Sequence, residues 1–193
     1  MRVAITGLPA SGKSTLCKMF ASLGAEVIDS DVIAHHLLDR SSNIHREVVG
    51  LLGEECLTEG SLDRAKIAKK VFCQPSLLHK LEEILHPKIR ELIQKRFGES
   101  QAPVCLVEVP LLYEVGWEKD FDRVIAVRAP LSESCQWFIR KQGTRYPNDY
   151  KERISRQFSQ EEKCRRADFV IDNLGTVDEL IPKVEAVYSS LVS

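Results

Sequence analysis

The sequence predicts an α/β fold built on a mostly parallel, five-stranded sheet, and three observations support this. Short runs of β-branched residues alternate with longer segments of helical periodicity, which is typical of strand–helix–strand units. A glycine-rich phosphate-loop motif stands between the first predicted strand and the first predicted helix. The 193 residues are 44% hydrophobic and 28% charged. This length and composition suit one compact domain.

Five strands are expected from the β-branched runs. They are Arg2–Thr6, Ala25–Asp29, Val104–Val109, Arg123–Val127 and Phe169–Asp172. Helical patterns follow the strands. The first, Ser14–Leu23, has apolar residues at helical spacing and is followed by Gly24, as expected where a helix ends. Ser159–Glu162 has the pattern of a capping box and predicts the start of another helix.

The long span Val32–Gln101 contains no convincing strand, so it is expected to form a helical insertion between two strands of the sheet. Helices are predicted at Asp31–Arg40, Ser61–Lys70 and Ser76–Phe97, the last of them interrupted at His86-Pro87. A second, smaller insertion is expected at the polar stretch Lys141–Tyr150, which contains Gly143, Pro147 and Asn148.

Composition excludes several classes of protein. A formal net charge of −1 argues against a general nucleic-acid binder. No apolar run approaches the ~18 residues of a membrane span, and the first residues are a poor match to a signal peptide. A cytoplasmic protein without a membrane partner is therefore expected. The six cysteines lack the spacing of metal ligands and are interpreted as free thiols of a reducing compartment.

Positive charge is concentrated in two segments. Residues 61–97 and residues 140–166 each carry nine lysines and arginines against four aspartates and glutamates. These segments could simply be the solvated faces of amphipathic helices. Alternatively, they could be mobile basic segments that close over a polyanion, because focused positive charge attracts phosphates.

The clearest functional motif is Gly7–Ser14, which fits the phosphate-loop pattern G-x-x-x-x-G-K-S/T in full. Its glycines allow successive N–H groups to surround a phosphate. Lys13 is expected to reach the β- and γ-phosphates, and Ser14 to hold Mg²⁺ through its hydroxyl. The nucleotide-binding residues predicted in this way are Gly7, Leu8, Pro9, Ala10, Ser11, Gly12, Lys13, Ser14 and Thr15. The chain lacks the base-reading N-K-x-D motif of GTPases, and its length favours a small-molecule kinase.

Three carboxylates stand at the ends of predicted strands, where α/β proteins bind their ligands. Asp31 could accept the proton of an acceptor hydroxyl or orient that hydroxyl, with Asp29 supporting the site or Mg²⁺ through water. The alternative is that Ser30 or Asp31 merely caps the following helix. Glu108 is expected to contact Mg²⁺ in its second sphere. Its alternative role is that of an edge residue paired with a surface lysine.

Several segments besides the phosphate loop resemble the dephospho-CoA kinase family, whose members phosphorylate the 3′-hydroxyl of dephospho-CoA at the last step of CoA biosynthesis. The segments are Val27–Asp31, Gly60–Arg64, Ile84–Arg90, Val109–Glu114, Asp122–Val124 and Ala167–Asn173. Together they extend the resemblance over nearly the whole chain. They are far more specific than the phosphate loop alone.

The resemblance implies a three-layer P-loop kinase core (about 1–31, 102–139 and 167–193), a helical CoA-binding insertion (about 32–101) and a lid (about 140–166). It implies ATP and dephospho-CoA as substrates, with Asp31 as catalytic base. Arg140, at the end of the predicted helix Leu131–Arg140, would act with Lys13 on the ATP phosphates and stabilise transition-state charge. His86 and Arg90 would face the acceptor. His86 could equally be a residue of a helix break, satisfied by backbone.

This chain departs from the family pattern in three places. Leu8–Ala10 replaces the more usual Gly-Ile-Gly, Glu108 stands where an aspartate is common, and the residues after Arg140 lack the usual Asp-rich start. The last departure leaves open whether Arg145 shares the task of Arg140. The segment Asn173–Gly175 could lie near the adenine base, although a turn is the simpler interpretation.

Other functions remain open from the sequence. The same motifs would suit another P-loop nucleoside or nucleotide kinase. A protein of a different class, a regulatory module that binds ATP without turning it over, would also carry a phosphate loop. A nucleic-acid-binding ATPase is disfavoured by the near-neutral charge. A monomer is slightly favoured.

Overall fold

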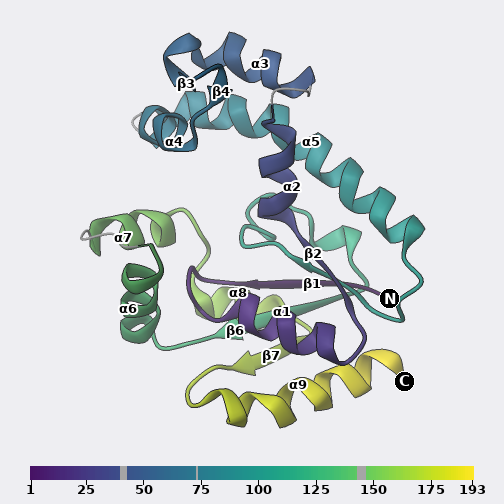
Figure 1. Ribbon diagram of the computed structural model, residues 1–193. Helices are drawn as coiled ribbons and strands as arrows, with labels where there is room; N and C mark the ends of the chain where they lie inside the picture. Colours follow the sequence, from purple (N-terminus) through teal and green to yellow (C-terminus); the bar gives the residue numbers. More distant parts are fainter. Residues whose placement is uncertain (40–42, 73, 143–146) are drawn as a thin grey trace. The chain divides into compact units, whose positions relative to one another are not determined.

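The computed structural model describes residues 1–39, 43–72, 74–142 and 147–193 (Figure 1). The chain divides into two compact units. The first, called the core unit below, comprises Met1–Ile28 and Ser100–Ser193. The second, called the helical unit, comprises Asp29–Glu99.

The core unit is organised around a five-stranded sheet with the order β2-β5-β1-β6-β7. Its strands are β1 (Arg2–Gly7), β2 (Glu26–Asp29), β5 (Cys105–Glu108), β6 (Arg123–Arg128) and β7 (Phe169–Asp172). β1 pairs in parallel with β5 and β6, and β6 with β7. The four residues from Val3 to Thr6 are completely buried, as expected of a central strand covered on both faces. The five predicted strands are thus confirmed, each end to within one residue.

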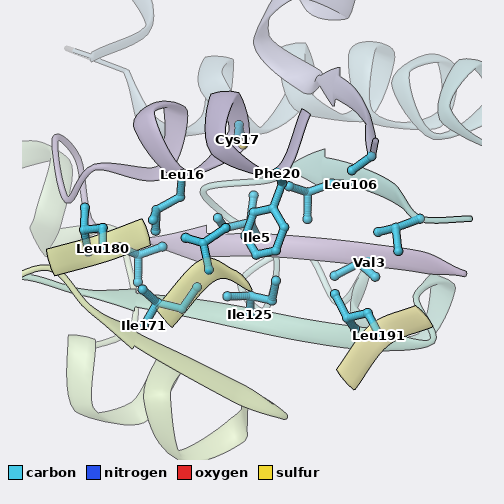
Figure 2. Close-up of a cluster of buried hydrophobic side chains, with 14 residues drawn as sticks. Val3, Ile5, Leu16, Cys17, Phe20, Leu106, Ile125, Ile171, Leu180 and Leu191 are labelled. Carbon is cyan, nitrogen blue, oxygen red and sulfur yellow. The ribbon is translucent and has the colours of Figure 1, made fainter. Parts of the chain in front are cut away.

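Helices cover both faces of this sheet. α1 (Lys13–Ser22) and α9 (Val177–Val192) pack on one face, where their apolar side chains meet those of the strands (Figure 2). The labelled members of this core are Val3, Ile5, Leu16, Cys17, Phe20, Leu106, Ile125, Ile171, Leu180 and Leu191. Burying each large apolar side chain contributes about 1.5–3 kcal/mol. α8 (Gln160–Arg166) contacts β1 and β6 behind the strands of Figure 1, which completes the predicted three layers.

Two predicted helix boundaries are present in the core unit. Gly24 follows α1 with a left-handed φ of +103°, and its N–H donates to the carbonyl of Ala21. Ser159 caps α8 by accepting the N–H of Glu162 at 3.2 Å, which is half of a capping box. The Glu162 carboxylate instead accepts from Arg165 and Arg166.

α6 (Leu131–Gln142) and α7 (Pro147–Ser155) pack together, with ring centroids of Phe138 and Tyr150 5.5 Å apart. The polar stretch expected at Lys141–Tyr150 is therefore helical at both ends. Arg145 lies outside the described residues. Among the described residues, no helix combines the length and the apolarity needed to cross a membrane. The five described cysteines are free thiols, as predicted.

In its described residues, the helical unit contains four α-helices, one 3-10 turn and a small hairpin. Its elements are α2 (Ser30–Leu37), α3 (Asn43–Leu52), the 3-10 turn η1 (Glu54–Cys56), β3 (Leu57–Thr58), β4 (Ser61–Leu62), α4 (Arg64–Phe72) and α5 (Pro75–Glu99). α5 contacts α2, α3 and α4. The buried residues between these helices are Ile44, Val48, Leu52, Cys56, Ile67, Val71 and Leu81.

The hairpin contradicts the prediction that the insertion holds no strand. Glu59 and Gly60 adopt left-handed φ values of 50° and 75°, which turns the chain so that β3 and β4 pair. The helix predicted from Ser61 therefore begins only at Arg64. Asp63 sets that start, because its Oδ1 accepts the N–H groups of Ala65 and Lys66.

The predicted interruption at His86-Pro87 is also wrong, because α5 runs through Pro87. Proline removes one helical hydrogen bond and leaves the carbonyl four residues earlier without its usual donor. Here both Pro87 and Glu83 are exposed, so water can satisfy that carbonyl. The burial of Leu81 and Ile89 on the inner face favours the continuous helix.

Many charges of the two basic segments are paired along their own helices. The pairs include Lys88–Glu91, Lys95–Glu99, Arg156–Glu152, Arg165–Glu162 and Arg166–Glu162. Most of these side chains are largely exposed, so each pair contributes little to stability. For these residues the structure favours the interpretation as solvated faces of amphipathic helices over that of basic segments that close over a polyanion.

Candidate active site

The phosphate loop begins at Gly7, the last residue of β1, where the backbone passes close to β6. Gly7 has a φ of +151°, and a Cβ atom there would lie 2.8 Å from the carbonyl oxygen of Val127. A side chain is therefore excluded by both conformation and space. The loop then turns, with Ala10 in the left-handed region and the N–H of Ser11 donating to the carbonyl of Leu8 at 3.2 Å.

Gly12 joins the loop to α1. Its φ of +101° is left-handed, and no side chain caps the helix. The N–H groups of Thr15 and Leu16 both donate to the Gly12 carbonyl, so the helix starts directly at the loop. The positive end of the α1 dipole is thereby directed at the loop, which favours an anion there.

Lys13 lies folded against the loop that precedes it. Its side chain is only 5% exposed, and its Nζ donates to the carbonyl oxygens of Gly7 and Leu8 at 3.0 Å each. The ammonium group is thus held beside the loop. A phosphate entering the loop would meet a cation already in place.

Ser14 and Glu108 are brought together from α1 and the end of β5. The Ser14 hydroxyl donates to the two carboxylate oxygens of Glu108 at 3.0 Å and 3.3 Å. A hydroxyl and a carboxylate are the hard oxygen ligands that Mg²⁺ prefers, so this pair fits the metal predicted from the sequence. Glu108 is hydrogen-bonded to the phosphate-loop helix. The alternative role of an edge residue paired with a surface lysine did not include this contact.

Asn173 belongs to the site, although it was not among the predicted site residues. Its Nδ2 donates to the carbonyl oxygen of Ser11 at 2.9 Å, and its own N–H donates to the carbonyl of Arg128. The sequence suggested a turn or a neighbour of the base for this segment. The two contact partners are 162 positions apart, so no local pattern could have indicated the contact.

Asp29 and Asp31 have different surroundings at the start of the helical unit. Asp29 caps α2, because its Oδ1 accepts the N–H groups of Asp31 at 2.8 Å and Val32 at 3.2 Å. The alternative in which Ser30 or Asp31 is the cap is therefore wrong. Asp31 is exposed in the first turn of α2. In the sheet, β5 lies between β2 and β1.

His86 and Arg90 lie one turn apart on α5, in the same unit as Asp31. Because α5 is continuous, the helix-break interpretation of His86 is wrong. Burial lowers the pKa of His86 below its ordinary value of 6.5, with a smaller opposing effect of Glu82. This burial favours the neutral form of His86. Arg90 is exposed.

Arg140 is exposed in the last turn of α6. α6 begins at Leu131, three residues after β6 ends at Arg128. Since β6 runs parallel to β1, α6 starts from the same edge of the sheet as the phosphate loop.

Known proteins similar to this chain point to one family. The family model described as CoaE: Dephospho-CoA kinase matches residues 1–179. A dephospho-CoA kinase from Chlamydia abortus is 40% identical over 195 residues, and the match covers 99% of this chain and 96% of that protein. A Thermus thermophilus crystal structure is similar with a TM-score of 0.86 and 33% identity, covering 100% of this chain and 98% of the other.

A dephospho-CoA kinase from Campylobacter jejuni also shares the fold. Its TM-score is 0.70 at 27% identity, and the superposition covers 99% of this chain and 96% of that one. The family match and the match to the sequence relative both extend over most of the chain. The chain therefore belongs to the dephospho-CoA kinase family.

Proposed function

We propose that this protein transfers the γ-phosphoryl group of ATP to the ribose 3′-hydroxyl of dephospho-CoA, giving CoA and ADP. Family membership supports the acceptor. The phosphate loop is the main observation that supports binding of ATP. In this loop Lys13 is held against the carbonyls of Gly7 and Leu8. Catalysis in this class of reaction rests on positioning and charge neutralisation.

Two cations of the core unit would act on the nucleotide. Lys13 would exchange its two carbonyl partners for oxygens of the β- and γ-phosphates, a favourable exchange because bonds between charged groups are the stronger ones. Arg140 would add its guanidinium to the γ-phosphate, where negative charge shifts during transfer. Its exposure leaves it able to move onto the nucleotide.

Ser14 and Glu108 would hold the magnesium ion that accompanies ATP. Ser14 would turn its hydroxyl oxygen to the metal, and Glu108 would accept hydrogen bonds from water on the metal. When bound, magnesium would neutralise negative charge on the phosphates. The 3.0 Å contact between Ser14 and Glu108 supports this assignment, because it brings both groups to one point.

Asp31 would act on the acceptor. As the ribose oxygen forms its bond to the γ-phosphorus, the bond from that phosphorus to the bridging oxygen breaks and ADP leaves. The hydroxyl proton passes to the Asp31 carboxylate. Asp29 is less suited, because one of its oxygens is engaged by the two N–H groups at the start of α2.

His86 and Arg90 would bind the acceptor. Dephospho-CoA carries a pyrophosphate group, and an arginine can bind phosphate oxygens through two parallel hydrogen bonds. His86, in its neutral form, can donate one hydrogen bond and accept another. Both residues lie on the helix that contacts α2, which carries Asp31.

The test is ADP release by purified protein with Mg·ATP, measured without acceptor, with dephospho-CoA and with a panel of nucleosides and nucleotides. We expect release that depends on dephospho-CoA and falls by orders of magnitude in Lys13→Ala. Preference for a nucleoside or nucleotide would assign another acceptor. ATP binding without acceptor-dependent release would indicate a regulatory module.

A further inference from the structure

We propose that Asn173 is a positioning residue that holds the phosphate loop in its nucleotide-binding conformation by way of the Ser11 carbonyl. The proposal rests on the nucleotide-binding half of the function above. It assigns to the segment after β7 a role in phosphate binding rather than in contact with the adenine base.

The side chain of Asn173 is built into the core unit. It is only 7% exposed, and its Nδ2 donates to the Ser11 carbonyl at 2.9 Å. Its backbone is fixed as well, because its N–H donates to the carbonyl of Arg128 at 2.8 Å. β6 and β7 therefore supply a rigid support, and the amide reaches from it to the loop.

The loop is shaped to receive this amide. A Cβ atom on Gly12 would lie 2.4 Å from Nδ2 of Asn173, so the close approach requires glycine at that position. Gly12 also has the left-handed φ of +101° that glycine adopts without cost. The second glycine of the motif thus serves both the backbone conformation and the contact with Asn173.

Holding the Ser11 carbonyl also orients the next amide group. In a trans peptide the C=O and the N–H point in opposite directions. When the Ser11 carbonyl turns to Asn173, the N–H of Gly12 points away from Asn173. In phosphate loops the N–H groups point into the concavity that surrounds the phosphate. Asn173 thereby stabilises the peptide orientation that phosphate binding needs.

The test uses inorganic tripolyphosphate, which presents phosphates without a base. Binding of tripolyphosphate and of ADP to the full chain is measured by calorimetry for the wild type, Asn173→Ala and Asn173→Asp. We expect the affinity for both ligands to fall about tenfold in Asn173→Ala, since one buried hydrogen bond is lost. The loss should be larger in Asn173→Asp, because a carboxylate cannot donate to the Ser11 carbonyl.

Steady-state kinetics separate this role from a general loss of structure. The KM for ATP should rise about tenfold, while the KM for dephospho-CoA stays within about twofold. Asn43→Ala is the matched control, because it makes the same change at an exposed asparagine of the helical unit and should alter neither value. Thermal unfolding checks that each variant is folded. If Asn173→Ala is not folded, Asn173→Ser replaces it in the test, because its hydroxyl is a smaller hydrogen-bond donor.

Two results would overturn the proposal. One is unchanged tripolyphosphate affinity in folded Asn173 variants. The other is a loss of ADP affinity alone, which would assign the residue to the base. Because calorimetry needs no turnover, the test also works if dephospho-CoA proves not to be the acceptor. Failure of this proposal and failure of the proposed function are thus distinguishable.

Discussion

Asp29 and Asp31 stand two positions apart, and both are exposed. Asp29 accepts two N–H groups at the start of α2 and so has a role in the structure of that helix, whereas Asp31 is proposed as the general base. Removal of an N-terminal cap costs about 1 kcal/mol of stability. Removal of a general base lowers the rate by about 10²–10⁴. The two side chains therefore form a matched pair for separating structure from chemistry.

We predict that Asp29→Ala lowers the free energy of unfolding by about 1 kcal/mol. Asp31→Asn should leave the free energy of unfolding nearly unchanged and reduce kcat at least about 100-fold. Urea unfolding and steady-state rates at saturating substrate measure the two effects. Near-normal turnover in folded Asp31→Asn would remove this residue as the base.

The half-buried His86 gives stability a dependence on pH. Its pKa in the folded protein lies below 6.5, so the unfolded chain binds the proton more readily. As the pH falls below about 6.5, protonation therefore favours the unfolded state. The contribution of His86 to stability decreases until the pH reaches the pKa of His86 in the folded protein. Above that range the residue is neutral in both states and the contribution is complete.

We expect the His86 ring resonance to titrate with a midpoint below pH 6.5 in NMR spectra. The drop in free energy of unfolding from pH 7 to pH 5 should be smaller in His86→Gln than in the wild type. A His86 midpoint at or above 6.5 would contradict this account.

Among the helices, α8 is fastened to the core unit by a buried ion pair. Lys163 is 1% exposed, and its Nζ lies 2.9 Å from a Glu114 oxygen and donates to the Pro110 carbonyl at 2.6 Å. The same Glu114 oxygen accepts the N–H of Phe158 at 2.7 Å. The segment that follows β5 is thereby tied to the start and the middle of α8.

We predict that Lys163→Met lowers the free energy of unfolding by about 3–5 kcal/mol, because it leaves the Glu114 charge buried without its cation. The double variant Lys163→Met with Glu114→Gln should recover part of that loss, since the neutral amide can still accept from Phe158. Arg165→Met is the control on the same helix and should cost far less, because Arg165 is exposed. Equal losses for Lys163→Met and Arg165→Met would refute the anchoring role.

For the molecule as a whole, the sequence predicted the sheet better than the helical unit. The five strands contain β-branched runs that can be recognised from the local sequence alone. α3 was missed although Ile44, Val48 and Leu52 recur at helical spacing, and the hairpin was missed because two-residue strands carry no alternation. The break at Pro87 was wrong because packing along α5 outweighs one lost hydrogen bond.

The candidate site was predictable only where local motifs carry it. The phosphate loop, with Lys13 and Ser14, follows from a single contiguous pattern. The contacts of Glu108 with Ser14 and of Asn173 with Ser11 join residues 94 and 162 positions apart, which depends on strand order and not on local sequence. The roles of Asp31, His86, Arg90 and Arg140 stay predictions, to be tested by their variants.

The most direct test of the account is the identity of the reaction product. Purified protein is incubated with Mg·ATP and dephospho-CoA, and the product is analysed by mass spectrometry and phosphorus NMR. The account predicts a product one phosphoryl group heavier than dephospho-CoA, with a new phosphomonoester on the ribose 3′-oxygen and ADP formed in equal amount. Unchanged dephospho-CoA alongside ADP, or a phosphate on any other oxygen, would contradict it.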